Sequence, residues 1–205
     1  MNETIINAVK GARGSVKKRN FSQSFDLIVN LELMDPKKSE NKLNEVFDLP
    51  KGRGKDAEVV LFAEGSKDVG CKTYGTSDIE KLAKDKRGIR KISTATDFFL
   101  SEPKMMPIIG KTLGSVLAPR GKMPSIVAGD LKEIVDKSKK SVRIKVKDSP
   151  VIQCIVGTEN MKDEDVAENV ESVLKFLEKK LPKGKNNMGK IILKLTMGKP
   201  MKMAL

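Results

Sequence analysis

The chain contains no histidine and no tryptophan, and only one of its 205 residues is a tyrosine. Without histidine it cannot build a Ser-His-Asp or Cys-His triad, and it lacks a common zinc ligand. Its two cysteines, Cys71 and Cys154, stand far apart and form no Cys-x-x-Cys pair. This pattern is typical of a reducing compartment rather than of a disulfide or metal framework. We therefore expect a non-enzymatic protein with no catalytic residues, no metal and no cofactor.

Long apolar runs are also absent. No stretch reaches the roughly 18 apolar residues that a membrane-spanning helix needs, and the N-terminal stretch lacks the apolar centre of a secretory signal peptide. We expect a soluble, cytoplasmic protein without a membrane partner. Its length allows one large domain or two small ones, with enough chain to bury an apolar core.

Acidic residues are scarcer than basic ones. Lys and Arg total 40 and Asp and Glu total 27, which gives a formal net charge of +13. A positive field attracts polyanions such as nucleic acid, although the alternative interpretation is a surface charged only for solubility. Residues 4–25 and 179–205 contain no acid at all, and the second run carries eight lysines. If the two ends of the chain fold together, these runs merge into one basic surface that can neutralise RNA phosphates.

The N-terminal segment has an α+β pattern. Residues 4–18 show the apolar spacing of a helix. From Phe25 to Leu33 apolar and mostly polar residues alternate, which predicts a strand with one exposed face that ends at the turn Asp35-Pro36. Residues 39–48 are predicted to be looped or to pair with that strand.

The C-terminal segment repeats this pattern. Residues 141–147 and 151–157 each alternate, which predicts a hairpin around the turn between them. Residues 163–181 carry an apolar stripe on a helical period and stop before Pro182. Residues 191–195 form an apolar run that predicts a final strand.

The middle of the chain alternates between strand and helix signals. Residues 58–63 are continuously apolar after Glu58, as in a parallel strand that is covered on both faces. A helix is predicted for residues 77–86 with Ser77 as its N-cap. The further predicted elements are strand 96–100, helix 105–117 and helix 130–139. This order predicts a small α/β domain.

Neither terminal segment is large enough to bury its strands alone. The simplest solution is one discontinuous α+β domain built from residues 1–54 and 141–205. Residues 55–140 then form an inserted, Rossmann-like α/β domain. The chain crosses between the two domains near Gly54 and near Lys140, and a double crossing is a natural hinge.

The middle segment has its own acid-free window, residues 103–129. Within it, Arg120 and Lys122 lie in a loop stiffened by Pro119 and Pro124, which makes them candidates for a second RNA contact. An ordinary turn is the alternative.

Aromatic residues are too few for a platform on which unpaired bases stack. The basic surface is therefore expected to read folded RNA by its backbone and shape. The competing hypothesis is a nucleotide-binding enzyme in the middle domain. It has little support, because no Gly-x-Gly-x-x-Gly is present and the P-loop-like ending Gly110-Lys111-Thr112 follows Met105 where the motif requires glycine.

Several motifs occur in the order found in one protein family. They are Phe21-Ser22-Gln23-Ser24-Phe25-Asp26, Asp35-Pro36-Lys37-Lys38-Ser39, Leu49-Pro50-Lys51-Gly52-Arg53-Gly54-Lys55, Leu117-Ala118-Pro119-Arg120-Gly121-Lys122-Met123-Pro124 and Thr196-Met197-Gly198. Over nearly its whole length the chain resembles the ribosomal protein L1 family of the large-subunit stalk, in its archaeal branch. It departs from that family at Asn20, Ser24 and Lys190, where other residues are common.

The resemblance implies a structural ribosomal protein that binds large-subunit rRNA at the mobile stalk and assists release of deacylated tRNA from the exit site. It also implies a translational repressor that binds its own mRNA, and a monomer off the ribosome. The terminal domain is expected to carry the main RNA contacts. With the lysines of the C-terminal run, these are Phe21, Ser24, Asp26, Lys190, Lys194, Thr196, Met197 and Gly198. A buried core ring is the alternative for Phe21, and a turn that merely ends a strand is the alternative for Thr196-Met197-Gly198.

Overall fold

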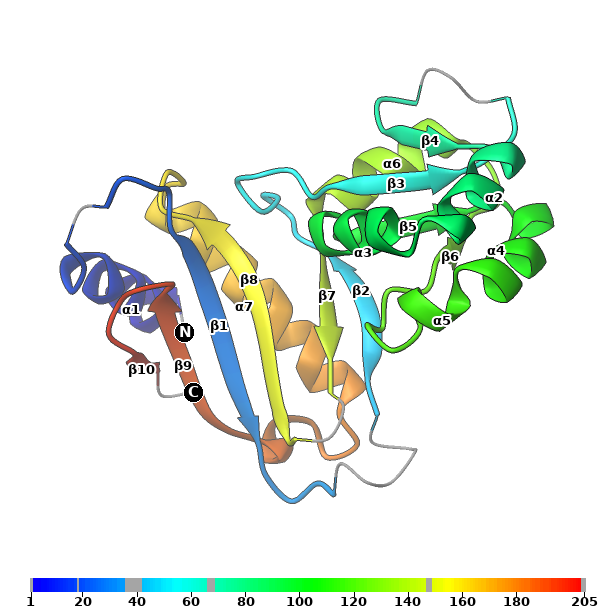
Figure 1. Cartoon of the computed structure of the whole chain (residues 1–205). Helices are drawn as coiled ribbons and strands as arrows, with labels where there is room; N and C mark the ends of the chain where they lie inside the picture. The colour runs from blue at the N-terminus through cyan, green and yellow to red at the C-terminus, as the bar shows by residue number, and fades with distance from the viewer. Residues whose placement is uncertain (1, 18, 36–41, 66–68, 147–148, 204–205) are drawn as a thin grey trace. The chain divides into compact units, whose positions relative to one another are not determined.

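The structure is a computed structural model that describes residues 2–17, 19–35, 42–65, 69–146 and 149–203. It divides into two compact units: unit 1 comprises Met1–Asp56 and Lys140–Leu205, and unit 2 comprises Ala57–Lys139. Both units contain helices and strands, so the predicted mixed α and β character is confirmed (Figure 1). The basic residue Lys18, the motif residues 36–39, residue 147 of a predicted strand and residue 148 of the predicted turn lie outside the described residues.

The centre of unit 1 is a four-stranded antiparallel sheet in the order β10-β9-β1-β8 (Figure 1). Its strands are β1 (Ser24–Leu31), β8 (Val151–Thr158), β9 (Met188–Leu195) and β10 (Met201–Met203). Along β1 every second side chain is buried, as the alternation predicts, because successive side chains of a strand point to opposite faces. The strand stops two residues earlier than predicted, and Leu33 is exposed with a positive φ of 56°.

Two helices cover the buried face of this sheet. These are α1 (Asn2–Gly14) and α7 (Asp163–Lys180), whose apolar residues join the same core as Phe25, Leu27 and Val29. The predicted helix at 163–181 is confirmed, with acids in its first turn and lysines in its last turn, as the helix dipole favours. A short 3₁₀ helix (Gly184–Asn187) leads from α7 into β9.

The predicted hairpin of residues 141–147 and 151–157 is wrong. Strand β7 (Ser141–Lys145) pairs with β2 (Asn44–Asp48) in a separate two-stranded sheet, whereas β8 pairs with β1. Of the predicted segment 39–48, residues 44–48 therefore pair with β7 and not with the first strand, and residues 39–41 lie outside the described residues. Alternation reports which face of a strand is buried but not which strand lies beside it. Here Phe47 of β2 packs against Phe176 of α7, with ring centroids 4.8 Å apart.

The connector that follows β2 is held by one buried side chain of α7. The amide of Asn169, which is 0% exposed, accepts from the Lys51 backbone N–H (3.1 Å) and donates to the carbonyls of Gly52 (2.8 Å) and Val156 (2.8 Å). Gly52 and Gly54 have φ of 69° and 79°, a region that glycine adopts without strain. The predicted turn-rich connector is thus tied to the core of unit 1.

Unit 2 contains a parallel sheet in the order β4-β3-β5-β6. Its strands are β3 (Val59–Phe62), β4 (Lys72–Tyr74), β5 (Phe98–Ser101) and β6 (Ser125–Ile126). Val59 and Leu61 pack with α6 (Leu131–Lys140), whereas Val60 and Phe62 pack with the four helices between Thr76 and Leu117, so both faces are covered. This arrangement explains why residues 59–63 read as an uninterrupted apolar run.

The helices of unit 2 differ from the prediction in detail. They are α2 (Thr76–Lys84), α3 (Lys86–Ala95), α4 (Met106–Thr112), α5 (Gly114–Leu117) and α6 (Leu131–Lys140), with a 3₁₀ turn (Pro103–Met105) before α4. The N-cap of α2 is Gly75 and not Ser77. Helix α3 was not predicted; it starts because the Asp85 carboxylate accepts from the N–H groups of Arg87 and Gly88. The predicted helix 105–117 is interrupted at Leu113.

Candidate nucleic-acid interface

The chain segments around Ser24 and Thr196 meet where β1 begins and β9 ends. The Ser24 N–H donates to Thr196 Oγ1 (3.2 Å), and that hydroxyl donates to the Ser24 carbonyl (3.2 Å). The Thr196 N–H also donates to the Ser24 carbonyl (3.1 Å). After Thr196 the chain turns, with the Gly198 N–H donating to the Leu195 carbonyl (2.8 Å). Two motifs that lie more than 170 residues apart in the sequence thus form one joint.

Two large apolar side chains stand exposed beside this joint. Phe21 is 53% exposed and Met197 is 59% exposed. Exposure of such side chains has a hydrophobic cost, and neither belongs to the core of unit 1. The alternative of Phe21 as a buried core ring is therefore wrong, and both residues are available for apolar contact with a partner.

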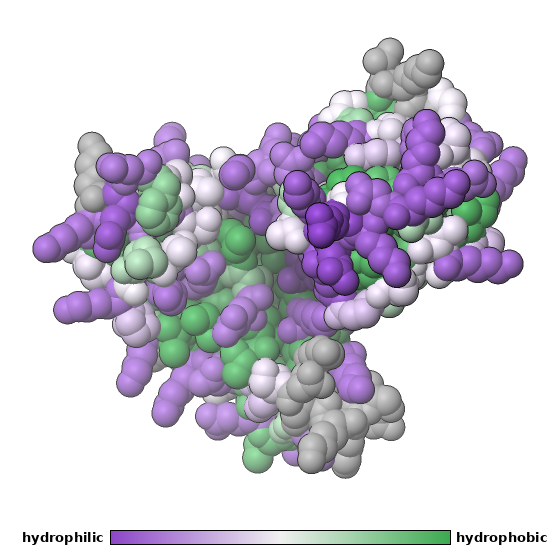
Figure 2. Space-filling model, in the orientation of Figure 1, coloured by the Kyte–Doolittle hydropathy of each residue, from purple (hydrophilic) through white to green (hydrophobic). Residues whose placement is uncertain are grey.

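The face of the sheet opposite the helices carries the charged residues of the candidate site. Asp26 on β1 lies directly across from Lys194 on β9. Burial raises the pKa of the Asp26 carboxyl above its ordinary value of 3.8, and the positive charge of Lys194 acts in the lowering direction. Lys190 and Lys194 alternate with the buried residues of β9, so they share this face, and Lys190 is exposed. Figure 2 shows hydrophilic side chains interspersed with apolar ones over these strands.

The acid-free runs at the two ends of the chain lie side by side in unit 1, because α1 contacts both β9 and β10. Lys10, Lys17, Lys199 and Lys202 are exposed there. Arg13, in contrast, is not part of the basic surface. Its guanidinium pairs with Asp163 (2.6 Å) and donates to the carbonyls of Glu159 and Met161.

Gly198 has a structural reason to be glycine. A Cβ at this position would lie 2.6 Å from Cγ2 of Val16 and 3.2 Å from Cβ of Leu195. Real Cβ contacts are almost never this short, so the turn packs against the segment after α1 only because position 198 has no side chain. Close approach by RNA remains a prediction for this residue, beside the internal contact that the structure shows.

Sequence reasoning missed a polar side chain that supports the joint. Gln23 is 0% exposed, and its Oε1 accepts from the Met197 N–H (3.2 Å). The backbone N–H of Gln23 donates to the Glu159 carboxylate (3.2 Å), and its backbone carbonyl accepts from the Glu159 backbone N–H (2.8 Å). The alternation of the strand could have indicated the burial of Gln23, because residue 23 is two positions before residue 25 and so lies on the same face as the buried residues 25, 27 and 29.

Arg120 and Lys122 lie in unit 2, where both serve the C-terminal end of α3. The Arg120 guanidinium donates to the Arg90 carbonyl (3.1 Å) and to the hydroxyls of Ser93 (3.0 Å) and Thr94 (2.9 Å). The Lys122 ammonium donates to the carbonyls of Ser93 (2.9 Å) and Thr96 (2.6 Å). The last carbonyls of a helix lack partners within it, so these cations cap α3. Their contact with RNA stays a prediction.

The described residues do not form the phosphate-binding loop, the reactive cysteine or the metal site that an enzyme would use. Gly110-Lys111-Thr112 lies at the C-terminal end of α4, whereas a P-loop places its glycines before a helix. Cys154 is buried, and burial raises the pKa of its thiol to about 12, which keeps the thiol protonated and unreactive. Across the described residues no group of three His, Cys, Asp or Glu side chains could hold a metal ion. None of the described helices is long and apolar enough to cross a membrane.

Comparison with known proteins gives one consistent result. The sequence profile of the Ribosomal protein L1p/L10e family matches residues 13–199. The Large ribosomal subunit protein uL1 of Methanobrevibacter smithii is 40% identical over 206 residues, covering 97% of each chain. The protein of the same name from Methanothermococcus thermolithotrophicus is 42% identical, covering 97% of this chain and 96% of its own. That of Pyrococcus horikoshii is 41% identical, covering 96% of this chain and 93% of its own.

Proposed function

The chain belongs to the ribosomal protein L1p/L10e family, and on that premise we propose that it binds large-subunit rRNA at the mobile stalk and assists release of deacylated tRNA from the exit site. Its role is that of a structural protein of the large ribosomal subunit in the cytoplasm, and it is not an enzyme. The similarity to archaeal relatives over nearly the whole length supports the archaeal branch.

The observation that carries this proposal is the joint between Ser24 and Thr196. It presents two exposed apolar side chains, Phe21 and Met197, beside lysines of the acid-free runs. Lysines near the joint would neutralise phosphates and release their counterions. Phe21 and Met197 would contact flat base or ribose surfaces exposed in a folded RNA. The proposed rRNA contacts are Phe21, Ser24, Asp26, Lys190, Lys194, Thr196, Met197 and Gly198.

The hydrogen bonds of Thr196 define what its hydroxyl can offer to RNA. Its proton is donated to the Ser24 carbonyl, and one of its two lone pairs accepts from the Ser24 N–H. The remaining lone pair can accept a hydrogen bond, but the group has no proton left for a phosphate. A ribose 2′-OH is a donor that matches this lone pair, and DNA lacks it. The joint therefore favours RNA over DNA of the same shape.

The test compares the full-length protein with two variants in binding to a large-subunit stalk rRNA fragment and to an unrelated RNA duplex, across a salt series. Met197→Ser should weaken binding to the stalk fragment by about tenfold, because fully burying a methionine side chain contributes roughly 1.5–3 kcal/mol. Leu33→Ser is the matched control, because Leu33 is exposed by 74% and lies away from the joint in the sequence. Equal binding of both RNAs by the unaltered protein would refute site-specific recognition.

A second function, translational repression, is proposed on the same surface. All eight proposed contacts lie in unit 1, so an mRNA segment that copies the rRNA target of this unit would compete for it. The protein would then repress its own mRNA when free of rRNA. An mRNA fragment that binds without displacing the stalk fragment would contradict a shared site.

The remaining features of the proposal concern organisation. We take unit 1 as a discontinuous α+β domain and unit 2 as an inserted, Rossmann-like α/β domain, supported by the parallel sheet with helices packed on both faces. We further propose a monomer off the ribosome, contact with exit-site tRNA on it, and a secondary RNA contact at Arg120 and Lys122. Sedimentation of the purified protein, with and without RNA, tests the oligomeric state.

A further inference from the structure

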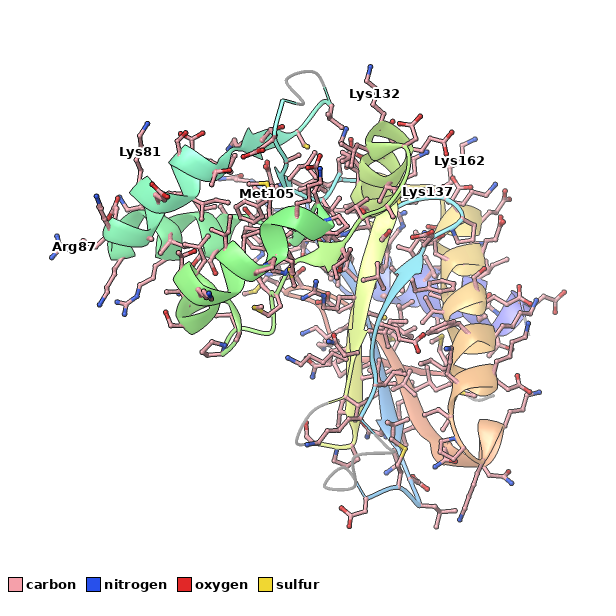
Figure 3. All side chains as sticks on the ribbon, turned by 90° about the vertical axis from the view of Figure 1, so that its right-hand side faces the viewer. Lys81, Arg87, Met105, Lys132, Lys137 and Lys162 are labelled. Carbon is pink, nitrogen blue, oxygen red and sulfur yellow. The ribbon has the colours of Figure 1, made fainter. Side chains whose placement is uncertain are left out.

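Helix α3 concentrates positive charge on its outer side. Lys86, Arg87, Arg90 and Lys91 are all exposed, whereas Ile89 and Ser93 of the same helix are buried. At about 100° per residue, the four cations fall within an arc of roughly 140° that faces away from the buried side. Helix α2, which contacts α3, adds the exposed Lys81 and Lys84. Figure 3 shows Lys81 and Arg87 projecting outward from their helices.

These charges do not serve the stability of α3. Lys86 and Arg87 occupy the first turn, at the positive end of the helix dipole, and no acid is present there. Lys86 and Arg90 are four residues apart, as are Arg87 and Lys91, and like charges at this spacing repel. The C-terminal end of the helix, where cations stabilise, is served instead by Arg120 and Lys122 from another loop.

Five of the six cations are also not engaged in salt bridges. Within the part of the chain that the structure describes, Lys84, Lys86, Arg87, Arg90 and Lys91 form no ion pair, whereas Lys81 of α2 pairs with Asp78 (3.7 Å). The acid nearest in the sequence to the cations of α3, Asp85, has its carboxylate engaged by the N–H groups of Arg87 and Gly88. A local arrangement that opposes helix formation without an internal compensation indicates a functional surface.

We propose that the outer face of α2 and α3, defined by Lys81, Lys84, Lys86, Arg87, Arg90 and Lys91, is a second RNA-contact surface, which binds the phosphate backbone without reading sequence. It lies in unit 2, apart from the eight residues proposed above to bind rRNA in unit 1. The face has no aromatic side chain among its outward residues, so it has no platform for stacking bases. Phosphate contacts position an RNA and add affinity that depends on salt.

The experiment uses the full chain and a fluorescent RNA duplex of arbitrary sequence, with the stalk rRNA fragment in parallel. The test variant replaces the four cations of α3 by glutamine (Lys86→Gln, Arg87→Gln, Arg90→Gln and Lys91→Gln). The matched control removes the same charge from four exposed lysines outside α2 and α3 (Lys72→Gln, Lys104→Gln, Lys111→Gln and Lys132→Gln). Glutamine forms helices about as well as lysine and arginine, so α3 should be retained.

The test variant should bind both RNAs at least tenfold more weakly at 0.1 M salt, with a salt slope reduced by about 0.9 for each phosphate that the protein no longer neutralises. The control should change affinity by twofold or less. A charge-preserving variant, Arg87→Lys with Arg90→Lys, should bind like the unaltered protein. Equally weakened binding in the test and control variants, unchanged binding in the test variant, or weakened binding in the charge-preserving variant would overturn the proposal.

The outcome is independent of the function proposed for unit 1. If the unaltered protein does not prefer the stalk fragment, that function fails while the comparison between α3 and control variants still stands. If the preference persists in the test variant and only overall affinity falls, both proposals hold. A test variant that binds RNA normally but loses binding to polyglutamate would assign the face to an acidic protein and reject RNA.

Discussion

Gly198→Ala is the substitution that most directly tests how the candidate interface is built. The added methyl group would lie 2.6 Å from Cγ2 of Val16 and 3.2 Å from Cβ of Leu195. Leu195 is fixed by its pairing with Phe25 in the sheet, so it has little room to move. Val16 follows the end of α1, so the segment after α1 is the part that must shift.

The size of the effect follows from overpacking. Inserting a methyl group into a tight contact costs typically about 1–3 kcal/mol in unfolding free energy. Val16→Ala alone removes the obstructing methyl group and, at a partly buried position, should cost about 1 kcal/mol. In the double variant the shortest contact, that with Val16, is gone, so its destabilisation should be smaller than the sum for the two single variants by about 1–2 kcal/mol.

The measurement is urea unfolding followed by far-ultraviolet circular dichroism. The chain has one tyrosine and no tryptophan, and Tyr74 lies in unit 2. Tyrosine fluorescence therefore reports unit 2 and should be unchanged in all three variants, which serves as an internal control. Binding to the stalk rRNA fragment is measured on the same samples.

Two results separate the possible roles of Gly198. If the double variant regains both stability and RNA affinity, the glycine is required for packing against Val16. If stability returns but affinity does not, close approach of the RNA backbone needs the missing side chain. A Gly198→Ala protein that is as stable as the unaltered one would refute the packing explanation.

Three further predictions concern single side chains. Asp26→Asn should stabilise the protein at pH 7, because the raised pKa of the Asp26 carboxyl means that its ionised form is disfavoured in the folded state. The gain in stability should disappear below pH 3.8, where this carboxyl is protonated in both the folded and the unfolded chain. Thermal melting at several pH values measures this dependence. Asn169→Ala should lower the unfolding free energy by about 2–4 kcal/mol, because the carbonyls of two buried hydrogen bonds and the N–H of a partly buried one lose their partner, and an unchanged urea midpoint would contradict this. Arg120→Gln should destabilise unit 2 by about 1–2 kcal/mol in tyrosine-detected unfolding, because acceptors at the C-terminal end of α3 lose their donor, and the secondary RNA contact proposed at Arg120 predicts weaker RNA binding as well; unchanged RNA affinity would leave Arg120 a helix cap only.

The elements predicted best were those with a clear period. The alternation along β1, the apolar stripe of α7 and the continuous apolar run of β3 each indicate how much of the element is buried. The spacing of apolar residues in the local sequence is enough to predict this burial. The errors concern which strands pair with each other and where helices and strands begin and end. Periodicity carries no information on which strand lies beside which, so β7 was assigned to β8 instead of β2. Helix α3 was missed because its charged residues obscure a short apolar face.

The candidate interface shows the same division. The motifs singled out Phe21, Asp26 and Thr196. The exposure of Phe21, the position of Asp26 across from Lys194 and the hydrogen bonds of Thr196 could not be predicted from them. Gln23 was overlooked because a buried amide looks like any polar residue in a sequence, and its value depends on a partner far along the chain. Arg13 belongs to the acid-free run 4–25 that was assigned to the basic surface. The sequence shows the charge of a side chain but not the direction in which that side chain points.

The sequence by itself determined the charge, the absence of histidine chemistry, the family and the burial of each main strand, because these depend on composition and on short-range periods. Only the tertiary structure decided which cations bind acceptors of the chain itself. Arg13, Arg120 and Lys122 donate to carbonyls, hydroxyls or carboxylates of the chain, whereas the four cations of α3 are exposed. The physical reason is that a cation binds the nearest geometrically suited acceptor, and folding alone sets which acceptors are near.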